Sequence, residues 1–144
     1  MTSSLTRMVA RALLAPILVV ALAILVKGYA NVGDGFAAGV VAALGVLLQV
    51  VVFGREAVAA ALPLRWAPAV ALVGLGIGFA VFAVPALLGD APLEHAPAPG
   101  VSPVHIGSLE LITAVVFDVG VFLLVLGASV AIIDAIAAPG EGEQ

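Results

Sequence analysis

The chain has 144 residues, of which 64% are hydrophobic and 10% are charged, and its formal net charge is -4. Soluble domains are about half apolar and about a quarter charged, so this composition excludes an ordinary water-soluble domain and favours helices packed in lipid. The basic stripe that nucleic-acid binding requires is absent from the sequence. With no cysteine and only His95 and His105 as imidazoles, the sequence predicts no disulfide, no metal site and no cofactor.

Four apolar segments follow one another along the chain, at about 9–26, 36–53, 67–88 and 106–133. Each approaches or exceeds the roughly 20 residues that an α-helix needs to cross the hydrocarbon layer. The segments are too long and too continuously apolar for the alternating strands of a membrane β-barrel. We therefore predict a single all-α membrane domain covering residues 1–144, an integral membrane bundle of four transmembrane helices.

The positions of arginine predict the orientation in the membrane, because positively charged loops resist translocation. Two arginines lie before or at the start of the first segment, and two lie between the second and third segments (Arg7, Arg11, Arg55 and Arg65). The connection after the third segment carries Asp90 and Glu94 with no lysine or arginine. Both termini are therefore expected in the cytoplasm, with the protein in the cell membrane.

Two segments outside the predicted spans have distinctive compositions. The connection 89–105 contains four prolines, which predict a stiff, extended outer loop that is either a spacer or a contact strip for a neighbouring subunit. The tail 134–144 is short and acidic, and we expect it to be frayed.

Asp118 is the acid placed deepest in an apolar segment. If the last helix begins near Ile106, Asp118 lies about 18 Å below that end, close to the bilayer centre. A carboxyl at that depth must face protein or water and must be paired or protonated. Two hypotheses follow: Asp118 carries protons, or it is a hydrogen-bonded acid that holds a neighbouring helix in register.

Three other polar side chains near the spans have two interpretations each. Glu110 lies about 12 Å and 80° around the same expected helix from Asp118, as either a solvated acid or a vestibule acid that feeds ions inward. Lys27 either extends to the membrane surface or forms an inward ion pair. Gln49 is expected to connect helices by hydrogen bonding rather than to bind an ion.

Pairs of glycines four residues apart occur in the second and third segments. Gly35 with Gly39, and Gly74 with Gly78, have the spacing that allows two helix backbones to approach closely. The third segment also contains Gly76, but there is no strand-to-helix turn and no lysine, so we predict a packing face and not a nucleotide loop. Gly33 and Gly35 are expected to allow tight turns at the start of the second span.

Two blocks of sequence resemble the MnhB-like family, the B subunits of Mrp (Mnh) type multisubunit Na⁺/H⁺ antiporters. The first block, GYANVGDGFAAGVVAALGVLLQ from Gly28, is similar to the family's glycine-rich loop and second span, although Val32 and Asp34 replace the usual proline and middle glycine. Asp34 is thus an acid that ordinary members lack. The second block, FDVGVFLLVLG from Phe117, looks like the family's last span, Asp118 included.

This resemblance implies an accessory subunit of a sodium/proton exchanger that contains other membrane subunits, among them large antiporter-like subunits that are generally assigned the main proton paths. The residues expected on or near an ion or proton route are then Asp118, Glu110, Lys27 and Asp34. Similar segments occur in B-like membrane subunits of energy-converting hydrogenases, which gives one alternative. Others are an autonomous four-helix cation transporter and a purely architectural subunit. No enzyme is predicted, because no nucleophile, base and orienting group can be assembled.

Overall fold

The computed structural model describes residues 3–28, 33–89, 104–106, 109–111 and 113–138. Four helices in this part of the chain are long and apolar enough to cross a membrane, so the prediction of an all-α, multi-pass membrane fold is confirmed. The elements in chain order are α1 (Ser4–Lys27), α2 (Gly35–Phe53), α3 (Arg55–Ala61), the 3₁₀ turn η1 (Leu64–Trp66), α4 (Ala67–Leu88), β1 (Val104–Ile106), β2 (Leu109–Leu111) and α5 (Thr113–Ala137).

Local signals fix several helix boundaries. The Ser3 hydroxyl caps α1 by accepting a hydrogen bond from the backbone N–H of Thr6 at 3.1 Å. Gly54 has φ +87°, a conformation that other residues rarely adopt, and it lets the chain leave α2 and enter α3 without an intervening loop.

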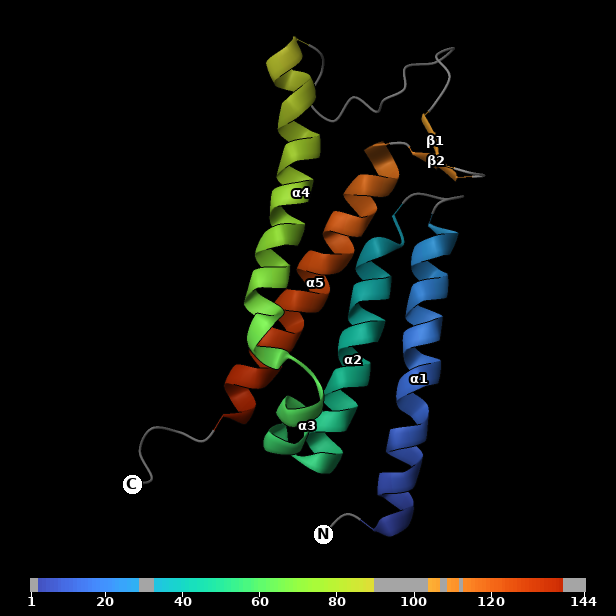
Figure 1. The fold of residues 1–144 in the computed structure, drawn as a ribbon, viewed down its shortest axis with the longest axis vertical. Helices are drawn as coiled ribbons and strands as arrows, with labels where there is room; N and C mark the ends of the chain where they lie inside the picture. Colours follow the sequence, from blue (N-terminus) through green and yellow to red (C-terminus); the bar gives the residue numbers. More distant parts are fainter. Residues whose placement is uncertain (1–2, 29–32, 90–103, 107–108, 112, 139–144) are drawn as a thin grey trace.

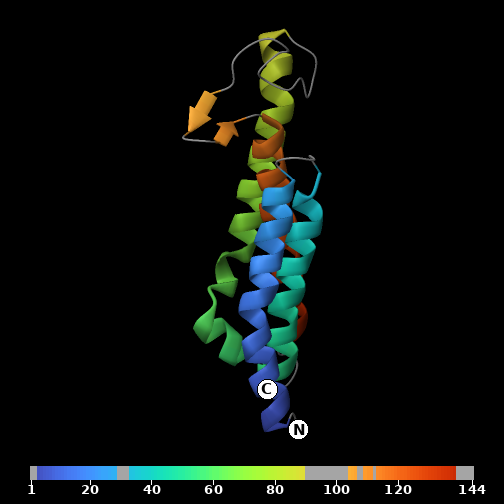
Figure 2. The ribbon, with the colours of Figure 1, turned by 90° about the vertical axis from the view of Figure 1, so that its right-hand side faces the viewer.

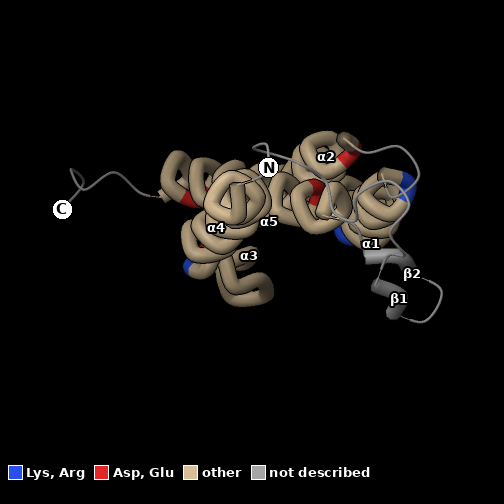
Figure 3. Tube along the Cα trace, turned by 90° about the horizontal axis from the view of Figure 1, so that it is seen from above, with Lys and Arg blue, Asp and Glu red and all other residues tan. Residues whose placement is uncertain are grey.

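The four long helices lie side by side in a single row in the order α1, α2, α5, α4 (Figure 1). The row is narrow when turned by 90° (Figure 2), and seen from above α1 and α4 lie toward opposite ends of it, with α3 projecting from one face (Figure 3). Consecutive long helices run antiparallel, so the start of α1 and the end of α5 lie at the same end of the molecule. Because α5 packs between α2 and α4, the last helix joins the two halves of the chain.

Glycines set the close approach of the helices. A Cβ added at Gly74 of α4 would collide with the backbone of α5 at Leu124, and a Cβ at Gly120 of α5 would lie 3.1 Å from the Gly74 carbonyl. On the other side of α5, a Cβ at Gly39 of α2 would lie 2.9 Å from Val125. Small residues at such contacts allow the dispersion contacts that hold helices together in lipid.

The last span begins later than the sequence predicted. Residues 109–111 form β2, which pairs antiparallel with β1 so that Val104 lies opposite Leu111 and His105 opposite Glu110. The helix then starts at Thr113 and not at Ile106, and it continues to Ala137, through the first residues of the expected tail. The prediction of a span at 106–133 was therefore wrong at its start. The rest of the outer loop, 90–103, and of the tail, 139–144, lies outside the described residues.

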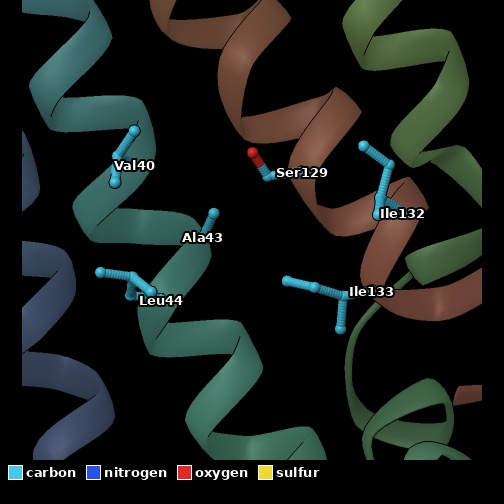
Figure 4. Close-up of a pocket in the computed structure, with 6 residues that line it drawn as sticks. All are labelled: Val40, Ala43, Leu44, Ser129, Ile132 and Ile133. Atoms are coloured by element: carbon cyan, nitrogen blue, oxygen red, sulfur yellow. The ribbon is translucent and has the colours of Figure 1, made fainter. Parts of the chain in front are cut away.

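Burial is uneven along the row. Half of the apolar stretch of α2 is buried inside the molecule, against 6% of the stretch that contains α4. An open groove of about 240 Å³ lies between α2 and α5, lined by Val40, Ala43, Leu44, Ser129, Ile132 and Ile133 (Figure 4). The flat arrangement therefore leaves most of the apolar surface of α1 and α4 to be covered by lipid or by other proteins.

Candidate functional site

The start of α5 carries Asp118 into the middle of the row. From Thr113 to Asp118 is about 7.5 Å along the helix axis, at 1.5 Å per residue. The carboxyl therefore lies in the second turn of α5, and the expected distance of about 18 Å from the start of this helix was wrong because the helix begins later. Asp118 is nevertheless only 5% exposed, so it is shielded by protein.

Two glycines make room for the Asp118 side chain. A Cβ added at Gly28, at the end of α1, would lie 2.7 Å from Oδ2 of Asp118, and a Cβ at Gly35, the first residue of α2, would lie 3.0 Å from Oδ1. The carboxyl thus occupies a slot formed where α1 ends and α2 begins. Any side chain at either glycine would displace it.

The connection from α1 to α2 also supplies a hydrogen bond to this carboxyl. The backbone N–H of Gly33 donates to Oδ2 of Asp118 at 3.3 Å. Gly33 has φ +122°, which glycine adopts without strain and which no other residue readily adopts. The carboxyl lies beside the N-terminus of α2, whose unpaired amides and helix dipole favour a negative charge.

A second acid and a lysine border the same slot. Lys27 Nζ lies 3.6 Å from Oδ2 of Asp34, with 71% of the lysine side chain and 30% of the aspartate side chain exposed. Oδ2 of Asp34 is itself buried and has no hydrogen-bond partner. A Cβ at Gly28 would lie 3.2 Å from Cβ of Asp34 as well as 2.7 Å from Asp118. Gly28 therefore separates the two aspartates, and we call Lys27, Asp34 and Asp118 the acidic cluster.

The sequence indicated these three residues separately, and the structure brings them together. Gly28, which no spacing argument indicated, touches both aspartates. Glu110 is not on the helix that carries Asp118: its backbone lies in β2, and its side chain lies outside the described residues. The 12 Å and 80° separation expected from one continuous helix therefore does not apply.

The remaining predicted residues lie at helix contacts. Gln49 of α2 is buried and donates from Nε2 to the backbone carbonyl of Ala10 in α1 at 2.8 Å. A Cβ at Gly78 would lie 3.8 Å from the Phe117 ring, an ordinary contact and much looser than that at Gly74. Sequence reasoning missed Gly120 and Gly127, both of which pack on the α4 backbone. Their separation of seven residues, which places them on one face of α5, is the signal that identifies them.

An ion pair joins α3 to the C-terminal end of α5, far along the helices from the acidic cluster. The Arg55 guanidinium donates from Nε to Oδ1 of Asp134 at 2.7 Å and from Nη2 to Oδ2 at 3.1 Å. This hydrogen-bonded carboxylate raises the pKa of Arg55 further above its usual value. The pair fixes the position of α3 under α5, and no sequence pattern indicated it.

Among the described residues, no group of three or more His, Cys, Asp or Glu side chains is placed to hold a metal ion. Four helices that can cross a membrane, with a shielded carboxyl where three of them meet, define a multi-pass membrane protein. Residues 5–131 match the family model described as a domain related to the MnhB subunit of Na⁺/H⁺ antiporters. The chain therefore belongs to this family, and the match extends from the first turn of α1 well into α5.

A relative is similar over much of the chain. It is a Rhizobium meliloti (strain 1021) protein named as the A/B component of a probable K⁺/H⁺ antiporter, and it is 36% identical over 114 residues. The matched segment covers 77% of this chain but only 11% of the relative. The chain thus corresponds to a small part of a much longer polypeptide.

Proposed function

We propose that this chain is an accessory membrane subunit of a heteromeric monovalent cation/proton antiporter. The observation that carries the proposal is the family match over residues 5–131, which includes all of α2 and α4, almost all of α1 and most of α5. The open row of helices is compatible with a role within a complex, because the apolar surface on α1 and α4 is open to neighbouring subunits as well as to lipid. The transported ion is Na⁺ or K⁺, since the family description names one and the relative names the other.

Within that complex we propose that the acidic cluster forms part of the proton or cation route. Asp118 is shielded from solvent, while the partly exposed Asp34 and the exposed Lys27 lie between it and the solvent. Acids shielded by protein within membrane spans are typical of proton and cation routes. Lys27 and Asp34 lie between this shielded acid and the solvent, so ions could reach Asp118 from this side.

The partners we propose are other membrane subunits, including large antiporter-like ones. The relative supports this, because the segment similar to this chain is only 11% of a polypeptide whose name joins the A and B components of an antiporter. We propose that both termini are cytoplasmic, since four arginines lie either in the first turns of α1 or in the connection between α2 and α4 (Arg7, Arg11, Arg55 and Arg65).

The transport proposal is tested with Asp118→Asn in the assembled complex. Inverted membrane vesicles are given a proton gradient, and its collapse on addition of Na⁺ or K⁺ is followed with a ΔpH-sensitive dye. Asparagine keeps the size of the side chain and an oxygen that can accept from Gly33, but it cannot bind or release a proton. We expect cation-dependent collapse to fall to the level of vesicles without the complex.

The matched control is Glu56→Gln, which removes an exposed acid on α3 far from the cluster and should leave transport unchanged. Co-purification of the other subunits establishes that both variants assemble. Normal transport by an assembled Asp118→Asn complex would reject the route and leave an architectural role. Co-purification with hydrogenase subunits would reassign the parent complex, and cation flux by the purified chain alone would indicate an autonomous transporter.

A further inference from the structure

We propose that the protein binds an anionic phospholipid at the helix ends farthest from the acidic cluster. The phosphate is held by α1, and an acyl chain lies against α2 and α3. The first part of this site is an open groove of about 570 Å³ at the start of α1, lined by Ser4, Arg7, Met8, Arg11, Ala12 and Phe53. Both charged residues in this lining are arginines. They lie one helical turn apart and so share one face of α1.

The arginine nearer the membrane is oriented by an aromatic ring. The Arg11 guanidinium lies 5.2 Å from the centre of the Phe53 ring at the end of α2. Stacking on a ring holds the planar guanidinium while its N–H groups remain directed outward in the plane. Those donors match the oxygens of a phosphodiester, to which arginine binds through paired hydrogen bonds.

The lengths of the helices place these arginines at the depth of lipid phosphates. The 19 residues of α2 extend about 28 Å, close to the hydrocarbon thickness of about 30 Å. Phe53, the last residue of α2, therefore marks the edge of the hydrocarbon, and Arg11 lies beside it. Arg7 is about 6 Å further out along α1, among the headgroups.

A second groove continues from the first toward the membrane interior. Its volume is about 230 Å³, and it shares Arg11 and Phe53 with the first groove. The Gln49 amide in its wall is already used in the hydrogen bond to Ala10. The other lining residues are apolar and come from α1, α3 and the segment after α3 (Leu14, Ala57, Val58, Ala61 and Leu62). An apolar groove that starts at a pair of arginines fits an acyl chain below an anionic headgroup.

The charges near these helix ends favour an anionic over a zwitterionic lipid. Arg55 is neutralised by Asp134, and Arg65 stacks on Trp66 at 5.7 Å outside both grooves. The lining of the two grooves contains no acid. A choline headgroup would bring its own positive charge toward the arginines, whereas phosphatidylglycerol brings only the phosphate.

The experiment uses the assembled complex reconstituted with trace phosphatidylglycerol that carries a photoreactive diazirine in its acyl chain. After irradiation, lipid adducts on this chain are mapped by mass spectrometry. We expect adducts on peptides covering α1 and α3, and few from the matched phosphatidylcholine probe. Arg11→Gln should lower labelling roughly fivefold, which is the effect of one basic residue at an anionic membrane surface, and Arg7→Gln with Arg11→Gln should lower it further.

Arg65→Gln is the control, since it removes an arginine at the same end of the molecule but outside the grooves. It should not change labelling. Equal labelling by the two lipid probes, unchanged labelling in the double variant, or absence of adducts on α1 and α3 because a neighbouring subunit covers the grooves would each overturn the proposal. Co-purification of the other subunits verifies that the variants assemble.

Discussion

At the scale of single residues, Asp118 fits where it does because its neighbours are glycines, which have no side chains. Gly28 and Gly35 leave the space that the carboxyl occupies, and Gly33 provides the amide that binds it. Asp34, which replaces the family's usual glycine, places a second carboxylate and its Lys27 partner at the same junction. Three glycines at the junction of α1 and α2 thus determine the surroundings of Asp118.

A single methyl group at Gly35 should therefore disturb the site. The Cβ of Gly35→Ala would collide with the Asp118 backbone carbonyl, so α2 must move away from α5. Overpacking of this kind costs about 1–3 kcal/mol. We expect a lower unfolding temperature of the detergent-purified complex and slower cation-dependent proton flux. Unchanged stability and flux would show that the contact between α2 and α5 is looser than described.

At the scale of elements, α4 is held mainly through α5, and the contact depends on which face of α4 carries each glycine. Gly74 lies against the α5 backbone, whereas a Cβ at Gly76 would meet nothing within 4 Å. The sequence presents both residues within one Gly-x-Gly-x-Gly run. Since the helix is apolar on all sides, polarity does not indicate which glycine faces a partner helix.

The two glycines provide a matched pair of substitutions. Gly74→Ala should destabilise the association of α4 with α5 by about 1–3 kcal/mol, because the added methyl meets backbone that cannot rotate away. Gly76→Ala adds the same methyl group and should change stability by less than about 0.5 kcal/mol. The measurement is the fraction of folded, assembled complex as temperature rises. Similar losses for both variants would contradict the orientation of α4.

At the scale of the whole molecule, the open row predicts which helices can be joined. The natural chain has no cysteine, so cysteine pairs can be introduced without background. A pair at Ala43 and Ser129, which line the groove between α2 and α5 (Figure 4), should react with a short bifunctional maleimide. A pair at Val19 of α1 and Phe79 of α4, toward the two ends of the row, should not link within one chain. Efficient linking of this second pair would indicate a closed bundle.

The proposed orientation makes a separate prediction for the same cysteine-free background. Cysteines at Ser3, which caps α1, and at Ala59 in α3 lie at the helix ends that carry the arginines. They should be protected in intact cells from a membrane-impermeant maleimide. A cysteine at Ala98, in the connection between α4 and β1, should react. The opposite labelling pattern would place both termini outside.

Four membrane-spanning helices followed from the sequence alone, because the free energy of transferring a segment into lipid adds up along that segment and needs no knowledge of its neighbours. The same reasoning identified Asp118, Asp34 and Lys27 as unusual near apolar spans. Only the tertiary structure decided the row order, the start of α5 at Thr113 and the meeting of the two aspartates at Gly28. Helices that are apolar on every side associate through the fit of small residues, and that fit depends on the three-dimensional shape of both partners.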